Sequence, residues 1–443
     1  MIANRFQDQA ILKIVYNFLW LFLEKGAQLF FLFFTTVWLA RYLGPSDFGV
    51  YNYAISFVML FLPLGQMGLN GVVIHRLVSR AALIRKTLGT AIILQFIGGM
   101  IAFLTVLIML NVLRPDYDRH FFWTLIAASI LFAKPFDVLD SFFQSRTESK
   151  YVVFAKLISL AAFVTCTIYG IWAGLPGDYF VSLKASSFFI IAVALIYFYH
   201  RSAGDSILAC RFSSHHASYL LKKSWPLLLS GATAAVYMKL DQIMIGEMAD
   251  DFSVGIYAAA AQISELWYFL PWLIISSAFP YLIKSKNDQA GYDKKLQILY
   301  NFMALCGFLI AVITSVCSNI IINLLYGKEF VEASFILAVH VWAGVFIFMR
   351  TVLSRWLIIE NLTIYSIITH GAGAMVNVAL NFVLIPEYGG LGAAYATVFS
   401  YALASYFSLF LIPKGRQPRI MMTNALLNIL KVWRWRKTIL FKF

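Results

Sequence analysis

The chain has 443 residues, of which 61% are hydrophobic and only 13% are charged, with a net charge of +14. A soluble domain typically has about 25% charged residues, so this composition, with a mean hydropathy of +0.78, indicates a protein that lies mostly in lipid. A bilayer-spanning helix needs about 20 apolar residues, so the chain has room for roughly a dozen spans and none for a tethered soluble enzyme.

Apolar runs separated by charged residues, glycine or proline predict an all-α integral membrane protein with about twelve transmembrane helices. The first run is too long for the apolar region of a signal peptide, so it is expected to remain as a span. The polar stretch 200–223 separates six spans from six and predicts two six-helix lobes, 1–199 and 224–413, followed by a basic tail, 414–443. The predicted spans lie at 15–39, 48–70, 88–112, 120–142, 152–174, 179–199, 224–246, 253–280, 298–323, 331–350, 361–385 and 391–413.

The basic residues predict the orientation of these spans. Segments on the side of the N-terminus, 350–360 among them, carry 26 lysines and arginines, and the opposite loops carry 4. This bias predicts that both termini and the 200–223 connection are cytoplasmic. The stretch 426–443 mixes Trp433 and Trp435 with basic residues, which predicts an amphipathic helix on the anionic cytoplasmic leaflet rather than a nucleic-acid site.

Two stretches of the chain share a pattern. Phe-Gly-Val-Tyr at 48–51 and Val-Gly-Ile-Tyr at 254–257 are each followed by Phe-Leu-Pro, with the prolines at Pro63 and Pro271. Six spans in each half with matching second helices predict a parallel internal repeat about an axis along the membrane normal. The alternative is a chance match, because glycine and proline are common in membrane helices.

The same regions carry a family resemblance. Arg-Tyr-Leu-Gly-Pro at 41–45, Asp-Gln-Ile-Met-Ile-Gly at 241–246 and Ile-Ser-Glu-Leu-Trp at 263–267 resemble the signatures of Wzx-type O-antigen flippases, within the multidrug/oligosaccharidyl-lipid/polysaccharide exporter superfamily. The resemblance implies a flippase that moves an undecaprenyl-diphosphate-linked oligosaccharide from the cytoplasmic to the periplasmic leaflet of the bacterial inner membrane. It also implies membrane lipids, a polysaccharide polymerase and chain-length machinery as partners.

Several kinds of active site are absent from the sequence. It has no Gly-x-x-x-x-Gly-Lys-Ser/Thr phosphate loop, no cluster of residues with metal-ligand spacing and no paired cysteines. We therefore expect no enzyme activity, metal or cofactor. Two alternatives stay open: a drug/cation antiporter, whose cavity is expected to carry acids rather than lysines, and a glycan polymerase or ligase, which the short extracytoplasmic loops disfavour.

Ionisable residues inside the predicted spans give the sharpest functional signal, because such a charge needs a partner or a water-filled cavity. We expect Lys25 in the first span and Lys239 in the seventh to bind the diphosphate. Glu24, Asp241 and Glu265 are candidates for ion coupling or gating. The structural alternative is an ion pair between Lys239 and Glu265. Alternatively, such a pair would join Lys25 and Asp241.

Neutral amides recur at a helical spacing. Gln66 and Asn70 in the second span, and Asn377 and Asn381 in the eleventh, are each four residues apart, so each pair is expected to line one helix face. These side chains are candidates for binding sugar hydroxyls. The alternative is that they form hydrogen bonds between helices.

The remaining intramembrane charges have structural interpretations. Lys134 and Asp137 are three residues apart and are expected to pair on one helix face. Lys156 and Lys184 lie near span ends, from which they can reach the membrane surface, so we assign them no function. Two single histidines are expected to be neutral and hydrogen-bonded: His340 and His370.

Overall fold

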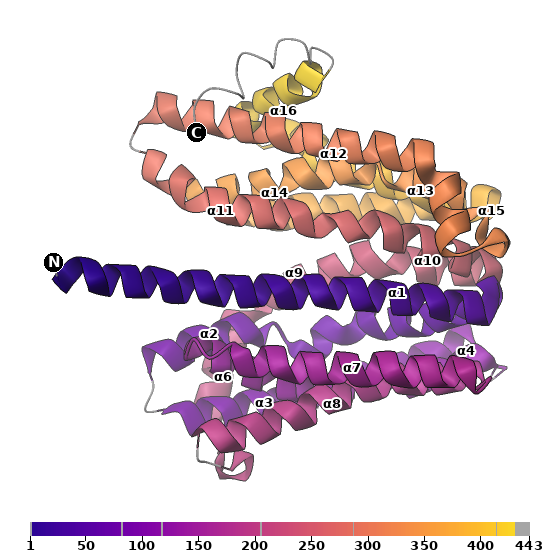
Figure 1. Ribbon diagram of the computed structural model, residues 1–443, viewed down its shortest axis with the longest axis horizontal. Coiled ribbons are helices and arrows are strands. Elements are labelled where there is room, and N and C mark those ends of the chain that lie inside the picture. Colours follow the sequence, from indigo (N-terminus) through magenta and orange to yellow (C-terminus); the bar gives the residue numbers. More distant parts are fainter. Residues whose placement is uncertain are drawn as a thin grey trace. The chain divides into compact units, whose positions relative to one another are not determined.

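The computed structural model describes residues 2–80, 83–116, 118–203, 206–286, 288–412 and 414–429 (Figure 1). In the first helix, side chains are described from Gln28 onward. Every regular element of the described chain is helical, and no strand occurs within these ranges. The all-helical architecture predicted from the sequence is therefore confirmed for this part of the chain.

The chain divides into two compact units, Met1–Ile243 and Met244–Phe443. The boundary falls inside one long helix, α9, and most of that helix belongs to unit 1. The elements of unit 1 are α1 (Ile2–Gln66), α2 (Leu69–Ser79), α3 (Ile84–Leu113), α4 (Arg119–Ala128), α5 (Ile130–Ala133), η2 (Lys134–Asp137), α6 (Val138–Ser145), α7 (Lys150–Trp172), α8 (Gly177–Ala203), η3 (Ile207–Ala209) and most of α9 (Ser214–Met248).

Unit 2 contains the end of α9 and all the helices that follow. Its elements are α10 (Asp251–Glu265), η4 (Leu266–Tyr268), α11 (Phe269–Ser285), α12 (Gln289–Leu325), η5 (Lys328–Phe330), α13 (Ala333–His340), α14 (Ala343–Ile359), α15 (Thr363–Ser405), η6 (Phe407–Phe410) and α16 (Arg416–Ile429).

Nine helices of the described residues are long and apolar enough to cross a membrane. Two of these, Gln28–Ser79 and Thr363–Phe410, have 52 and 48 residues, more than twice the roughly 20 that one crossing needs. Each is interrupted by a glycine with left-handed φ, Gly44 (72°) and Gly389 (55°), and each covers two predicted spans. The predicted seventh span lies in α9, which is not among the nine. Eleven of the twelve predicted spans therefore correspond to the nine apolar helices, and the remaining one corresponds to α9.

The predicted second span, 48–70, does not form one continuous helix. α1 ends at Gln66, and Met67 (φ 50°) and Gly68 (φ 63°) turn the chain before α2 begins. A Cβ atom on Gly68 would lie 2.5 Å from the backbone nitrogen of Leu228 and 2.7 Å from the carbonyl oxygen of Ser224. Glycine is needed here both for its φ angle and because α9 passes so close.

α9 is held on unit 1 by contacts along its length. A Cβ atom on Gly231 would lie 3.5 Å from Pro63, and the Ser56 hydroxyl donates a 2.5 Å hydrogen bond to Oε1 of the buried Gln242. The unit boundary therefore lies after α9 has packed on α1, whereas the predicted lobe boundary was the polar connection 200–223. Elsewhere in unit 1, α7 and α8 lie side by side (Figure 1).

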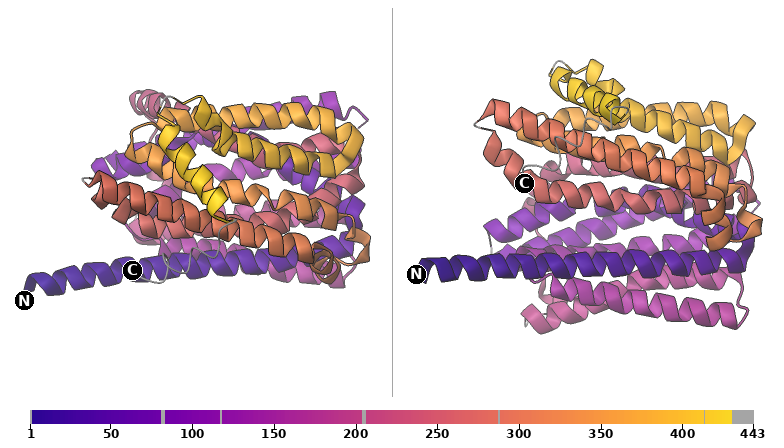
Figure 2. Two further views of the ribbon diagram at one scale, coloured as in Figure 1. Left: turned by 90° about the horizontal axis from the view of Figure 1, so that it is seen from above. Right: turned by 45° about the horizontal axis from the view of Figure 1, so that its top comes forward.

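In unit 2, α16 packs against α12 (Figure 2). The Gln417 amide donates to the Asp293 carboxylate at 2.6 Å, and the Gln297 amide donates to the carbonyl oxygen of Met421 at 3.0 Å. Met422 is fully buried in the core shared by α12, α14 and α16. The first half of the predicted surface tail, 414–443, is thus part of the packed unit, and its residues after Ile429 lie outside the described chain.

Candidate functional site

Two lysines of unit 1 lie within electrostatic range of each other: Lys184 of α8 and Lys239 of α9. Both side chains are half-buried, and Nζ of Lys184 lies 5.0 Å from the centre of the Phe163 ring. Within the described part of the chain, neither lysine has a carboxylate within salt-bridge distance. Two repelling cations away from bulk water favour the binding of an anion.

Two further lysines in the unit 1 helices, Lys134 and Lys156, each have an acidic neighbour. Lys134 Nζ lies 2.7 Å from Asp137 Oδ2, which confirms the pairing predicted from their spacing. Lys156 Nζ lies 4.0 Å from Asp140 Oδ2, a contact that the sequence did not indicate. The acidic neighbours neutralise the charges of Lys134 and Lys156. Of these four lysines, Lys184 and Lys239 are therefore the two whose charges can attract an anionic ligand.

The sequence interpretation missed Lys184. Its position near a span end suggested that it reaches the membrane surface, and only tertiary structure brings it to Lys239.

Asp241 follows Lys239 by two residues, about 200° around the helix, and is 3% exposed, whereas Lys239 is half-buried. Glu24 and Lys25 lie on α1, and their side chains are outside the described residues.

Gln66 and Asn70 do not share a helix face, because the break at Met67 and Gly68 separates them. Both residues instead accept hydrogen bonds from the side-chain amide of Gln95 on α3. Nε2 of Gln95 donates to the backbone carbonyl oxygen of Gln66 at 3.2 Å and to Asn70 Oδ1 at 3.1 Å. The prediction of one polar helix face was therefore wrong here. The pattern had treated 48–70 as one uninterrupted helix.

Asn377 and Asn381 do share a face of α15, as their spacing predicted. Nδ2 of Asn381 donates to Oδ1 of Asn377 at 3.4 Å, and both residues are fully buried. Nδ2 of Asn377 has no hydrogen-bond partner among the described residues. In this conformation, both side chains lie inside unit 2 and not on an open surface.

Glu265 is the last residue of α10, directly before η4. Its neighbour Ser264 lies 2.5 Å from Nδ1 of His340, a buried histidine whose ring also packs edge-on against Tyr257. The hydrogen bond expected for His340 is therefore present. Glu265 and Lys239 belong to different units, so an ion pair between them stays a prediction.

Arg350 lies in a different environment from the one predicted. It was counted in a cytoplasmic segment, 350–360, but α14 continues to Ile359 and Arg350 is only 5% exposed. Its guanidinium donates to the carbonyl oxygen of Ala404 at 2.7 Å and to that of Ser366 at 3.3 Å. Arg350 thus ties α14 to α15, and it does not contribute to the basic cytoplasmic surface.

Residues with metal-binding chemistry do not gather in the described ranges. Among those residues, no group of three or more His, Cys, Asp or Glu side chains lies in a position to hold an ion. The four cysteines are free. The site that the described geometry offers is therefore the cationic pair in unit 1.

Comparison with known proteins places the chain in a family. A family model described as "Polysaccharide biosynthesis protein" matches residues 14–286, which is more than half of the chain. The chain belongs to this polysaccharide biosynthesis family. Its relatives include the "Probable flippase AglR" of Haloferax volcanii, which is 31% identical over 188 residues, covering 41% of this chain and 39% of AglR.

A second relative matches over a longer stretch. The "Probable low-salt glycan biosynthesis flippase Agl15" of Haloferax volcanii is 24% identical over 409 residues, covering 89% of this chain and 83% of Agl15. The family is thus one of flippases and not of enzymes.

Solved structures of transporters have the same fold. "Lipid II flippase MurJ, inward closed conformation" matches with a TM-score of 0.71 and 17% identity, over 96% of this chain and 93% of that one. An inward-facing multidrug resistance MATE family transporter of the MOP superfamily matches with a TM-score of 0.63 and 11% identity, over 93% and 96%. The chain is therefore a multi-pass membrane protein with the MOP superfamily fold.

Proposed function

We propose that this protein is a flippase for a lipid-linked oligosaccharide, and that the carrier lipid is undecaprenyl diphosphate. The headgroup moves from the cytoplasmic to the periplasmic leaflet of the bacterial inner membrane while the polyprenyl tail stays in lipid. The observation that carries the proposal is the pair formed by Lys184 and Lys239, which repel each other and have no carboxylate partner in the described part of unit 1. Family membership and the names of the relatives support the same substrate class.

A diphosphate is suited to this pair of lysines. Its oxygens accept charge-assisted hydrogen bonds from ammonium groups, and such bonds are roughly twice as strong as neutral ones. A bound diphosphate would also relieve the repulsion between the two lysines, and the low dielectric constant of the site strengthens both effects. Lys25 on α1 is the third cation that we propose for the headgroup, on the basis of the sequence.

Alternating access fits the proposed organisation of the chain. We propose twelve spans in two six-helix repeats, with both termini in the cytoplasm, that transport the substrate by alternating access. Asp241, Glu265 and Glu24 are the residues that we propose for ion coupling or gating.

The two pairs of side-chain amides differ in how accessible they are to a sugar. Gln66 and Asn70 are half-buried beside the α1–α2 break, and we propose that they reach sugar hydroxyls. Asn377 and Asn381 are fully buried, so we propose that they do so only in a conformation that opens α15. The polymerase and chain-length machinery are the proposed partners that use the product.

A drug/cation antiporter is the rival within the same fold. Its substrate would carry positive charge, which Lys184 and Lys239 would repel at close range. The cationic pair therefore favours an anionic substrate, whereas a transporter for cations would need unpaired acids at this position.

The proposal is tested by removing the two charges. Lys184→Gln and Lys239→Gln are expected to lower surface polysaccharide in a flippase-deleted host by about tenfold each, the effect of about 1.4 kcal/mol of lost binding. Lys184→Arg is expected to keep part of the activity, because the charge persists. The readout is surface polysaccharide per membrane-inserted protein, and Lys223→Gln, which removes an exposed cation from the same helix as Lys239, is the control. Normal export by a protein that carries both Lys184→Gln and Lys239→Gln would refute the proposal.

A further inference from the structure

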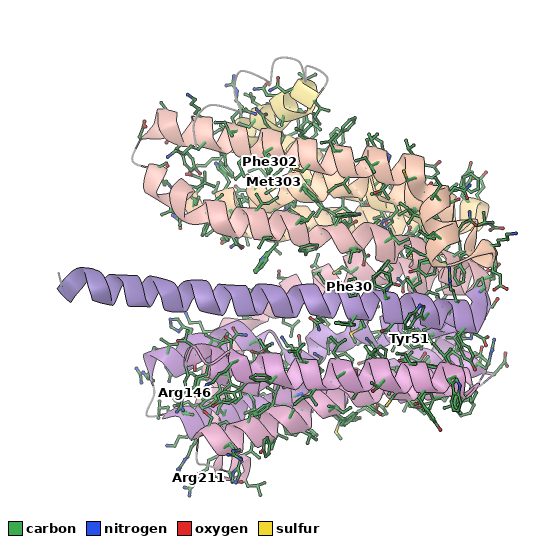
Figure 3. The ribbon with its side chains drawn as sticks, in the orientation of Figure 1. Phe30, Tyr51, Arg146, Arg211, Phe302 and Met303 are labelled. Carbon is green, nitrogen blue, oxygen red and sulfur yellow. The ribbon has the colours of Figure 1, made fainter. Side chains whose placement is uncertain are left out.

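A second cationic cluster lies at the end of unit 1 that the charge bias places in the cytoplasm. It combines Arg76 and Arg80 at the end of α2, Lys86 at the start of α3, and His215 and His216 at the start of α9. Among the described residues, the charged groups that act on the His216 ring are all basic. Figure 3 shows Arg146 and Arg211, two further basic residues, at the same end of this unit.

Among the described residues, two nitrogen atoms of this cluster are buried without a hydrogen-bond partner. His216 is 9% exposed, and its Nδ1 lies 3.0 Å from the Ser213 hydroxyl. If that hydroxyl donates to Nδ1, the ring proton lies on Nε2, and Nε2 has no hydrogen-bond partner among the described residues. The Arg76 guanidinium lies 4.4 Å over the Tyr219 ring, and its Nε is likewise buried without a partner.

The position of His216 is fixed by the connection before α9. The backbone nitrogen of Arg211 donates to the carbonyl oxygen of Arg85 at 3.2 Å, and that of Ser213 donates to the Thr90 hydroxyl at 3.0 Å. A Cβ atom on Gly89 would lie 2.7 Å from the Arg211 nitrogen. This close contact anchors the connection on α3, so the cluster is assembled by packing and not by chance encounter of surface side chains.

Buried donors usually have acceptors, because an unsatisfied donor costs about 1–3 kcal/mol. Here the donors also lie among like charges, which a neutral acceptor such as water would not offset. An anion satisfies both conditions, since its oxygens accept hydrogen bonds and its charge balances the cluster. The planar donor set of an arginine matches the oxygen geometry of a phosphate.

We propose that Arg76 and His216 bind a phosphate group at the cytoplasmic end of unit 1, with Arg80 and Lys86 contributing to the surrounding positive field. The phosphate is carried either by an anionic lipid of the cytoplasmic leaflet, which attracts basic segments next to the membrane, or by a soluble diphosphate. This site uses none of the residues proposed for transport. This phosphate site goes beyond the proposed function, and its test is independent of the test of that function.

The test uses the full-length protein in nanodiscs of phosphatidylcholine. In one arm phosphatidylglycerol is titrated into the discs, and in the other pyrophosphate is added to phosphatidylcholine discs. Binding is measured by the shift of the thermal unfolding midpoint and, for the lipid, by native mass spectrometry. Both arms are run at high salt, where the Debye length is only a few ångströms and exposed charges are screened.

Arg76→Gln and His216→Asn are expected to weaken binding by about tenfold in at least one arm, as the loss of a charge-assisted hydrogen bond implies. Lys222→Gln, which removes an exposed cation from α9, is the control and is expected to change binding less than about twofold at high salt. Arg76→Lys keeps the charge and is expected to give an intermediate loss, which provides a second variant if His216→Asn does not fold.

A loss confined to the phosphatidylglycerol arm supports the proposal and identifies a lipid headgroup. A loss confined to the pyrophosphate arm supports it and identifies a soluble diphosphate. Affinities equal to wild type for Arg76→Gln in both arms would overturn it. Transport activity is not part of the readout, so failure of this site leaves the roles of Lys184 and Lys239 to their own test.

Discussion

Gln95 of α3 donates a hydrogen bond to Asn70 of α2 across 3.1 Å, and the same amide nitrogen donates to the last carbonyl group of α1, that of Gln66, at 3.2 Å. These two contacts bridge the turn at Met67 and Gly68. Gln95 is only 1% exposed, and its Oε1 has no hydrogen-bond partner among the described residues. One buried amide therefore anchors both sides of a broken membrane helix to its neighbour.

Replacing Gln95 with leucine is expected to destabilise the protein by about 1–3 kcal/mol, because two acceptors next to the break lose their donor. The measurement is the unfolding midpoint of the purified protein in detergent. Thr105→Val is the matched control, since Thr105 lies on the exposed side of α3 and bonds only to the carbonyl group of Ile101 in its own helix. A Gln95→Leu protein as stable as this control would contradict the anchoring role.

The topology prediction rests on the bias of basic residues. Single cysteines at Asp116 and Arg211, in a background from which the four native cysteines have been removed, are expected to react with membrane-impermeant reagents from opposite sides. The reason is that 200–223 carries basic residues of the cytoplasmic set, whereas Asp116 lies in a loop of the other set. If both cysteines react from the same side, the predicted twelve-span topology is wrong.

Asp118 caps the N-terminus of α4 and makes the stability of unit 1 depend on pH. Burial alone would raise the pKa of its carboxyl group. The hydrogen bond from the Phe121 backbone (3.1 Å) and the nearby His120 (3.0 Å) and Arg114 outweigh burial, so the pKa is lowered. A lowered pKa means that the folded state binds this proton less readily than the unfolded state does.

The stabilisation from Asp118 is therefore complete above the ordinary aspartate pKa of about 3.9, and it is lost as the pH falls through the lower, folded-state pKa. Asp118→Ala is expected to cost about 1 kcal/mol at neutral pH. The difference in unfolding midpoint between wild type and variant is expected to shrink from pH 5 to pH 3. A difference that grows on acidification would reverse the sign of this assignment.

Lys25 tests the part of the transport proposal that comes from the sequence. Lys25→Ala is expected to abolish surface glycan while the protein still inserts, and Lys25→Arg is expected to retain part of the activity because the charge remains. Export is measured against the amount of protein in the membrane. A well-inserted Lys25→Ala protein with normal export would remove this residue from the site.

Local patterns were predicted well from the sequence because they depend on spacing along one helix. Lys134 meets Asp137 three residues later, and Asn381 meets Asn377 four residues earlier. The all-helical membrane fold followed from composition for a similar reason, since a bilayer leaves few structures that satisfy every backbone group.

Features that depend on tertiary packing were missed. The helix break after Gln66 occurs at Met67 and Gly68. Methionine has no marked preference for left-handed φ, and a single glycine in an apolar run is an ambiguous signal of a helix break. Lys184 comes within electrostatic range of Lys239 only through the packing of helices distant in sequence. Arg350 was taken for a loop residue because a buried arginine that donates to backbone carbonyl groups leaves no partner pattern in the sequence.

The packing of α16 determines how far the protein can be shortened for biochemical work. Met421, Met422 and Ala425 contribute to the same hydrophobic core as α12 and α14, and so does Ile429, the last residue described. A stop codon near residue 414 would therefore remove one wall of that core, and not merely a dispensable basic extension. Shortened versions for crystallisation, display or reporter fusion should keep the chain at least as far as Ile429.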